Sequence, residues 1–227
     1  MSGIKLKYPP AYPVFFLGGS AGAVEAFKEI AHALPNDFPA PLFFILHRKK
    51  GGENKQNLLP DIIRNVTDLE VCEPEDGEIV RSRRIYIAPI DKHLYVEDNR
   101  IYLRDEPEES AWRPSINVLF KSGAKEYKQR TVCVLLTGLL DDGVDGLISC
   151  TKHGGVTIAQ SPEDAYQPNL PLNAILKDHP SYVAPIKDMA LLLCELAQYE
   201  GEAELTRSII EKAALTARLE KKALKEK

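Results

Sequence analysis

The chain has 227 residues, 44% of them hydrophobic, so it can bury a substantial core in one large α/β domain or two small domains. Its formal net charge of −4 argues against a general nucleic-acid binder, which needs a basic face to neutralise phosphates. Four widely spaced cysteines form no C-x-x-C motif, so we expect neither a metal site nor a redox motif. Because the sequence shows no signal peptide and no apolar run of membrane-spanning length, we expect a cytoplasmic protein without direct membrane insertion.

Strands and helices alternate in the first third of the chain. Short apolar runs at residues 12–18 and 42–47 are typical of buried strands, and residues 69–72 predict a third strand. Residues 23–34 have helical spacing of their apolar side chains, and residues 55–65 also predict a helix. This alternation indicates a parallel sheet covered by helices.

The pattern changes in the middle of the chain and then resumes. Residues 84–88, 94–97 and 101–104 are short alternating segments, and Asp98-Asn99 supplies turn chemistry between the last two. We therefore predict a doubly wound α/β fold, with a mostly parallel sheet, helices on both of its faces and an inserted antiparallel hairpin. The later predicted elements are helices at 114–127, 144–152 and 188–198 and strands at 132–136 and 156–159.

The strongest local motif is Gly18-Gly19-Ser20-Ala21-Gly22, between a predicted strand and a predicted helix. It matches G-x-S-x-G, in which a sharp turn exposes a nucleophilic serine at the carboxyl end of a strand. The helix that follows supplies free N–H groups and a positive dipole end for a developing oxyanion. Two other interpretations of this motif remain open: a glycine-rich phosphate-binding turn and a purely structural turn. The dinucleotide pattern G-x-G-x-x-G is not met, because position 20 is serine.

A serine nucleophile needs a base and a group that orients the base. His47 ends the second predicted strand, so it is expected at the same sheet edge as Ser20. Asp142 follows the strand at 132–136 and would reach that edge too. The order Ser…Asp…His of α/β-hydrolases would instead pair Asp142 with His153 or His179, and spacing alone leaves this open. The other two histidines, His32 and His93, are less well placed.

From residue 12 to about residue 198 the sequence resembles the catalytic domain of CheB, the protein-glutamate methylesterase of chemoreceptors. Six motifs follow one another in the family's order. They are the serine loop at 18–23, the histidine stretch at 46–49, IYIAPIDKHL at 85–94, RPSINVLF at 113–120, LTGLLDDG at 136–143 and GGVTIAQ at 154–160. Six ordered motifs are far more specific than any one of them.

The resemblance implies Ser20 as the nucleophile, His47 as general base and acid, and Asp142 as the group that orients His47. It also implies an oxyanion hole made by the backbone N–H groups of Ala21 and Leu139. The implied reaction is acyl transfer from a glutamate γ-methyl ester on chemoreceptor helices, with glutamine deamidation as a second activity and no cofactor. On the substrate rim we expect Arg113 and the basic run Arg48, Lys49 and Lys50.

The sequence departs from the family pattern in several places. Leu140 replaces the family's glycine after the oxyanion residue, so a positive φ there would be strained. Asn117 replaces an aspartate. We expect an arm at 1–11, a CheB-like catalytic domain at 12–200, a charged helical extension at 201–227, and no receiver domain before residue 12, so that a separate receiver protein could act in trans. Two alternatives stay open: hydrolysis of another ester or amide, and a non-catalytic signalling adaptor.

Overall fold

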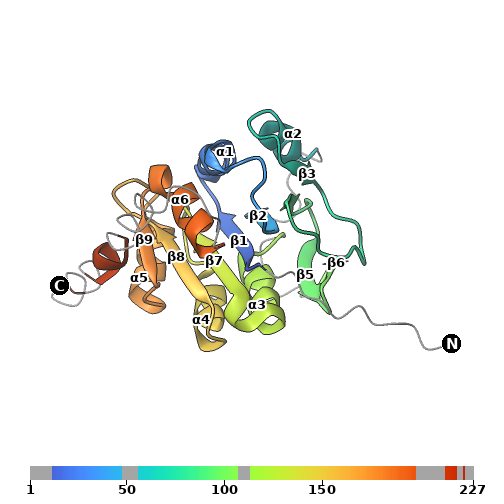
Figure 1. Cartoon of the computed structure of the whole chain (residues 1–227). Helices are drawn as coiled ribbons and strands as arrows, with labels where there is room; N and C mark the ends of the chain where they lie inside the picture. Colours follow the sequence, from blue (N-terminus) through green and yellow to red (C-terminus); the bar gives the residue numbers. More distant parts are fainter. Residues whose placement is uncertain (1–11, 48–55, 107–112, 198–212, 219–221, 223–227) are drawn as a thin grey trace.

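A seven-stranded parallel sheet forms the centre of the computed structural model, which describes residues 12–47, 56–106, 113–197, 213–218 and 222 (Figure 1). The strand order is β3-β4-β2-β1-β7-β8-β9, and every pairing in this sheet is parallel. The strands are β1 (Val14–Gly19), β2 (Leu42–Leu46), β3 (Glu70–Cys72), β4 (Arg84–Ile87), β7 (Thr131–Leu135), β8 (Val156–Gln160) and β9 (Tyr182–Ala184).

Helices cover both faces of the sheet, as the apolar strands require. The first hydrophobic cluster joins one face to α1 (Ala23–Ala33), α2 (Leu59–Arg64) and α6 (Ile186–Leu196). The second joins the other face to α3 (Ile116–Tyr127), α4 (Val144–Lys152) and α5 (Asn169–Lys177). Neighbouring residues of β1 serve opposite faces: Phe15 belongs to the first cluster and Phe16 to the second. The predicted doubly wound α/β fold is therefore confirmed.

The inserted antiparallel hairpin is also confirmed, with β5 (His93–Glu97) paired to β6 (Arg100–Arg104). Its turn residues Asp98 and Asn99 both have positive φ, which explains the polar residues at these positions. The alternating segment at 84–88 does not belong to this hairpin, because β4 pairs with β2 and β3 in the main sheet.

Several element boundaries differ from the predictions. Within the described residues α2 begins only at Leu59, with Pro60 in its first turn, a position where the missing N–H of proline does no harm. The elements α5 and β9 were not predicted, because α5 contains Pro171 and β9 has only three residues.

Part of the C-terminal extension contacts the core. Residues 213–218 are helical, with Ala213 and Ala217 buried in the two hydrophobic clusters. Residues 201–212 of this extension lie outside the described residues, as does the arm at 1–11. No helix in the described ranges is both long and apolar enough to cross a membrane.

Candidate active site

The residues singled out in the sequence come from three neighbouring strands. Ser20 follows β1, His47 follows β2, and Asp142 lies in the loop between β7 and α4. The chain builds outward from β1 in one direction through β2 and in the other through β7, so the strand order reverses beside β1. Open α/β sheets bind ligands at the carboxyl ends of strands next to such a reversal.

Ser20 occupies a tight strand-to-helix turn. Its backbone carbonyl accepts a hydrogen bond of 3.0 Å from Ala23 N–H, where α1 begins. Gly22 has φ of +84°, and a methyl group there would lie 2.7 Å from Cβ of Tyr166, so both conformation and space require glycine. The turn thus holds Ser20 at the N-terminus of α1.

His47 and Asp142 form a buried ion pair. Nδ1 of His47 lies 3.0 Å from Oδ2 of Asp142, and the two side chains are 2% and 7% exposed. The backbone N–H of His47 donates to the carbonyl of Gly19, which places His47 beside the Ser20 turn. With Nδ1 facing the carboxylate, Nε2 is the nitrogen able to exchange a proton with a nucleophile.

The N-terminus of α3 holds Asp142 in place. Oδ1 accepts hydrogen bonds from the Ser115 hydroxyl at 2.8 Å and from Asn117 N–H at 3.1 Å, and Oδ2 accepts one from Ile116 N–H at 2.8 Å. Burial alone would raise the pKa of Asp142, but the hydrogen bond and charge of His47, with the N–H groups of Ile116 and Asn117, lower it below its ordinary value. The carboxylate is therefore kept ionised, as an orienting group must be.

Asn117, which replaces the family's aspartate, has a structural contact of its own. Its side-chain oxygen accepts a hydrogen bond of 2.8 Å from Gly146 N–H, in the first turn of α4. The amide oxygen of Asn117 accepts this bond as a carboxylate oxygen could, and the bond links α3 to α4 in this chain.

Thr137 fastens three loops of the site together. Its hydroxyl donates to the carbonyl of Ala21 at 3.0 Å and accepts from Gln167 N–H at 2.8 Å, while its carbonyl accepts from Ser20 N–H at 3.0 Å. Its own N–H donates to the side chain of Gln160 at 2.8 Å. No role was predicted for Ser115, Thr137 or Gln160, although all three lie in motifs that resemble those of the family.

Of the two residues expected to form the oxyanion hole, Ala21 directly follows Ser20 in the chain, and Leu139 directly follows Gly138, which lies close to Ser20 in space. A methyl group on Gly138 would lie 2.9 Å from Cβ of Ser20, so the residue before Leu139 lies close to the Ser20 turn. Among backbone bonds outside regular elements in the described part, neither Ala21 N–H nor Leu139 N–H donates one. Leu140 has φ of +64°, so the positive φ considered for the family's glycine is present here with a leucine.

The remaining candidates are placed as follows. Arg48, Lys49 and Lys50 lie outside the described residues. Arg113 is largely buried and lies 3.4 Å from Asp105 in an ion pair. His153 and His179 precede β8 and β9, at the opposite edge of the sheet from Asp142, and their Nδ1 atoms contact backbone carbonyls of Ser149 and Ile175.

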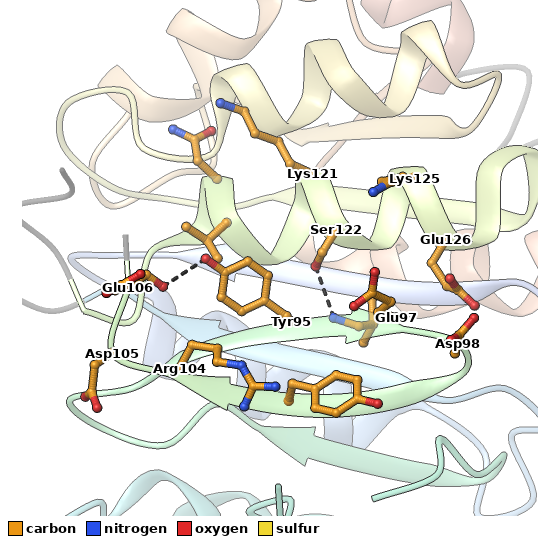
Figure 2. Close-up of a pocket in the computed structure, with 14 residues that line it drawn as sticks. Tyr95, Glu97, Asp98, Arg104, Asp105, Glu106, Lys121, Ser122, Lys125 and Glu126 are labelled. Carbon is orange, nitrogen blue, oxygen red and sulfur yellow. Dashed lines mark hydrogen bonds between the residues drawn. The ribbon is translucent and has the colours of Figure 1, made fainter. Parts of the chain in front are cut away.

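A large open groove lies away from the Ser20 turn, between the β5–β6 hairpin and α3. It has a volume of about 1100 Å³, and Tyr95, Arg104, Lys121 and Glu126 are among the residues that line it (Figure 2). Ser20, His47 and Asp142 are not among its lining residues, so this groove is separate from the candidate triad. Within the described ranges no group of three or more His, Cys, Asp or Glu side chains is arranged to hold a metal ion.

Comparison with known proteins identifies the family. The family model described as CheB methylesterase matches residues 15–193, most of the chain and all of the site described above. The chain belongs to the CheB methylesterase family. A solved structure of the Thermotoga maritima CheB methylesterase catalytic domain superposes with a TM-score of 0.76 at 29% identity, covering 82% of this chain and 99% of that one.

Curated members of the CheB methylesterase family carry consistent names. A Leptospira interrogans protein, provisionally named a protein-glutamate methylesterase/protein-glutamine glutaminase, is 30% identical over 82% of this chain and 96% of its own length. The methylesterase FrzG of Myxococcus xanthus is 30% identical, and a methylesterase/glutaminase of Caldanaerobacter subterraneus is 33% identical. These two match over 83% and 84% of this chain but over only 56% and 53% of their own lengths.

Proposed function

We propose that the chain is a cytoplasmic serine hydrolase that demethylates glutamate γ-methyl esters on the helices of a chemoreceptor or a similar signalling protein. The observation that carries the proposal is the buried His47–Asp142 pair beside the Ser20 turn, at 3.0 Å. The family supports the reaction type, since the relatives described above are named for glutamate demethylation and several also for glutamine deamidation.

In the proposed mechanism Ser20 Oγ attacks the ester carbonyl carbon while Nε2 of His47 takes the hydroxyl proton. The carbonyl oxygen becomes an oxyanion, which the N–H groups of Ala21 and Leu139 stabilise. The C–O bond to the methoxy group breaks, and the imidazolium returns the proton so that methanol leaves. Water then attacks the acyl-enzyme with His47 as base, which regenerates Ser20 and leaves a glutamate.

Asp142 has two tasks in this scheme. It fixes Nδ1 of His47 as the protonated nitrogen, and its negative charge stabilises the imidazolium that forms during acylation. Both need an ionised carboxylate, consistent with its lowered pKa. A glutamine side chain would react by the same steps with ammonia as the leaving group, which accounts for deamidation as a second activity.

The direct test is methanol release from methylated chemoreceptor cytoplasmic fragments. We expect release by the wild-type protein and none above background by Ser20→Ala, and we expect a fluorophosphonate probe to label the wild-type protein alone. Methanol release by Ser20→Ala at the wild-type rate would contradict the proposed nucleophile. Labelling without methanol release from any fragment would show a serine hydrolase with a different substrate.

A further inference from the structure

Three exposed apolar side chains lie in the loops next to the Ser20 turn. Leu139 is 47% exposed, Leu140 is 58% exposed and Tyr166 is 75% exposed. Tyr166 and Leu140 are the two most exposed large apolar side chains in the part of the chain that the structure describes. Isolated exposed apolar residues are common, but several around one proposed nucleophile indicate a binding surface.

The connecting loops bring these side chains to the Ser20 turn from the β7 and β8 side of the sheet. Gly138, which approaches within 2.9 Å of Cβ of Ser20 when given a methyl group, directly precedes Leu139 and Leu140. Tyr166 lies over Gly22, two residues beyond Ser20, with its Cβ 2.7 Å from the position of a Gly22 methyl group. The three side chains therefore come from the loops after β7 and β8, the strands that follow β1 in the sheet.

Hydrogen bonds hold the loops that carry these three side chains, although the side chains themselves are exposed. Gly138 N–H donates to the carbonyl of Gln167, the residue after Tyr166, and Thr137 bonds the same segment. The carbonyl of Leu140 accepts a hydrogen bond of 2.7 Å from the Asn173 side chain. A binding surface gains affinity from such preorganisation, because less side-chain and loop entropy is lost on association.

Leu140 also stands in a conformation that leucine disfavours. Its φ of +64° lies in the left-handed region, where glycine or asparagine would be more stable. Leu140 is 58% exposed, so burial against the residues that the structure describes does not offset the strain. An exposed leucine kept at a strained position beside a proposed catalytic serine points to a role in contacting a substrate.

We propose that Leu139, Leu140 and Tyr166 form an apolar rim that binds apolar side chains next to the reacting glutamyl ester of a helical protein substrate. This inference rests on the proposed function and names a feature of its substrate. A glutamate side chain that reaches Ser20 brings the surface of its own helix against the residues around the turn. On that helix the neighbours of the ester are the residues three and four positions away, with Cβ atoms about 5–6 Å apart. Apolar residues at those positions would bury the rim.

The test compares two synthetic helical peptides that each carry one glutamate γ-methyl ester. The first has leucine three and four positions on both sides of the ester, and the second has glutamine at those positions. Circular dichroism establishes equal helicity. We expect the wild-type protein to hydrolyse the leucine peptide with a kcat/KM at least about tenfold higher, as expected from about 1.4 kcal/mol of extra apolar contact.

The variant arm uses Leu140→Asn combined with Tyr166→Ser. Asparagine has nearly the shape of leucine and tolerates positive φ, so the backbone of the oxyanion loop is preserved. We expect the preference for the leucine peptide to fall to near unity through loss on that peptide. Leu215→Asn is the matched control, because Leu215 is 54% exposed and its helical turn packs beside His179 and Ser181, near the start of β9 at the opposite sheet edge.

The outcomes separate the rim from the proposed function. Equal kcat/KM for both peptides in the wild-type protein would overturn the rim and leave the methylesterase activity standing. If the double variant kept the wild-type preference for the leucine peptide, the rim proposal would also be wrong. If neither peptide is hydrolysed faster than by Ser20→Ala, the proposed function fails and the rim proposal fails with it.

Discussion

The hydroxyl of Ser115 donates a hydrogen bond of 2.8 Å to Oδ1 of Asp142, and both side chains are buried. This bond and the N–H of Asn117 occupy one carboxylate oxygen, while the other oxygen faces His47 and the N–H of Ile116. Each carboxylate oxygen of Asp142 therefore has its own partners, so that rotation of the carboxylate group would break hydrogen bonds at both oxygens. The start of α3 therefore sets the direction from which Asp142 meets His47.

We expect Ser115→Ala to lower kcat/KM for a methyl ester by about tenfold or more, because hydrogen bonds to charged groups contribute about 1.5–3 kcal/mol and tenfold corresponds to about 1.4 kcal/mol. Ser115→Thr keeps a hydroxyl and should recover part of the loss. Ser122→Ala is the matched control, since the Ser122 hydroxyl accepts from Val96 N–H in the groove of Figure 2 instead. Equal losses in Ser115→Ala and Ser122→Ala would show that the effect is a general one on α3.

Substitution of the histidines distinguishes the two possible orders of the triad. We expect His47→Ala and Asp142→Asn each to lower kcat on the order of 10³-fold or more, because the base and its orientation are lost. His153→Ala and His179→Ala should keep the wild-type rate, since these residues lie at the far edge of the sheet. If His47→Ala kept full activity while His153→Ala or His179→Ala lost it, His47 would not be the catalytic base.

Much of the site could be predicted because its chemistry depends on where strands end. The apolar runs before Ser20, His47 and Asp142 fix three strands, and parallel strands bring their carboxyl ends to one edge. The family motifs then indicated the order of the triad. The pairing itself, with Nδ1 of His47 on Asp142, needed the structure, because spacing in the sequence also allowed His153 and His179.

The supporting residues could not be derived from the sequence. Ser115 looks like an ordinary residue before a helix, and Thr137 looks like any residue at the end of a strand. Their roles depend on contacts between loops 27 and 116 residues apart in the chain. Hydrophobic periodicity reports which side of an element is buried, but it carries no information about which loops meet at the sheet edge.

The backbone at Leu140 makes a prediction about stability. We expect Leu140→Gly to raise the free energy of unfolding by up to about 1 kcal/mol, because the left-handed conformation costs a non-glycine residue about 1–2 kcal/mol and glycine gains more entropy when unfolded. Leu140→Ala keeps a Cβ at φ of +64° and should show no such gain in chemical denaturation. A loss of more than about tenfold in small-ester hydrolysis by Leu140→Gly, about 1.4 kcal/mol, would show that the leucine takes part in the oxyanion loop.

The basic run directly after His47 predicts electrostatic steering. We expect charge reversal of Arg48, Lys49 and Lys50 to lower kcat/KM for a glutamate-rich receptor fragment, mainly through slower encounter. The loss should shrink with added salt, since the screening length falls to about 3 Å at 1 M. Lys152→Glu, an exposed lysine at the opposite sheet edge, is the control. Equal losses on the fragment and on a small neutral ester would instead indicate damage to the placement of His47.

The lowered pKa of Asp142 predicts how stability changes with pH. Because the folded-state pKa lies below the ordinary value of 3.8, the ionised group stabilises the folded protein above that pH, and this contribution is lost as the pH falls through the lowered native value. We therefore expect the stability of the wild-type protein relative to Asp142→Asn to fall as the pH drops below about 4.

Asp178 provides an internal control of opposite sign. Burial raises its pKa, although the Thr151 hydroxyl donates a hydrogen bond of 2.8 Å to Oδ1. Its contribution is therefore fully present below the ordinary carboxyl pKa and is lost as the pH rises through the raised native value. On acidification the wild-type protein should gain stability relative to Asp178→Asn while it loses stability relative to Asp142→Asn. If the wild-type protein did not lose stability relative to Asp142→Asn on acidification, the assignment of an ionised, tightly held Asp142 would be wrong.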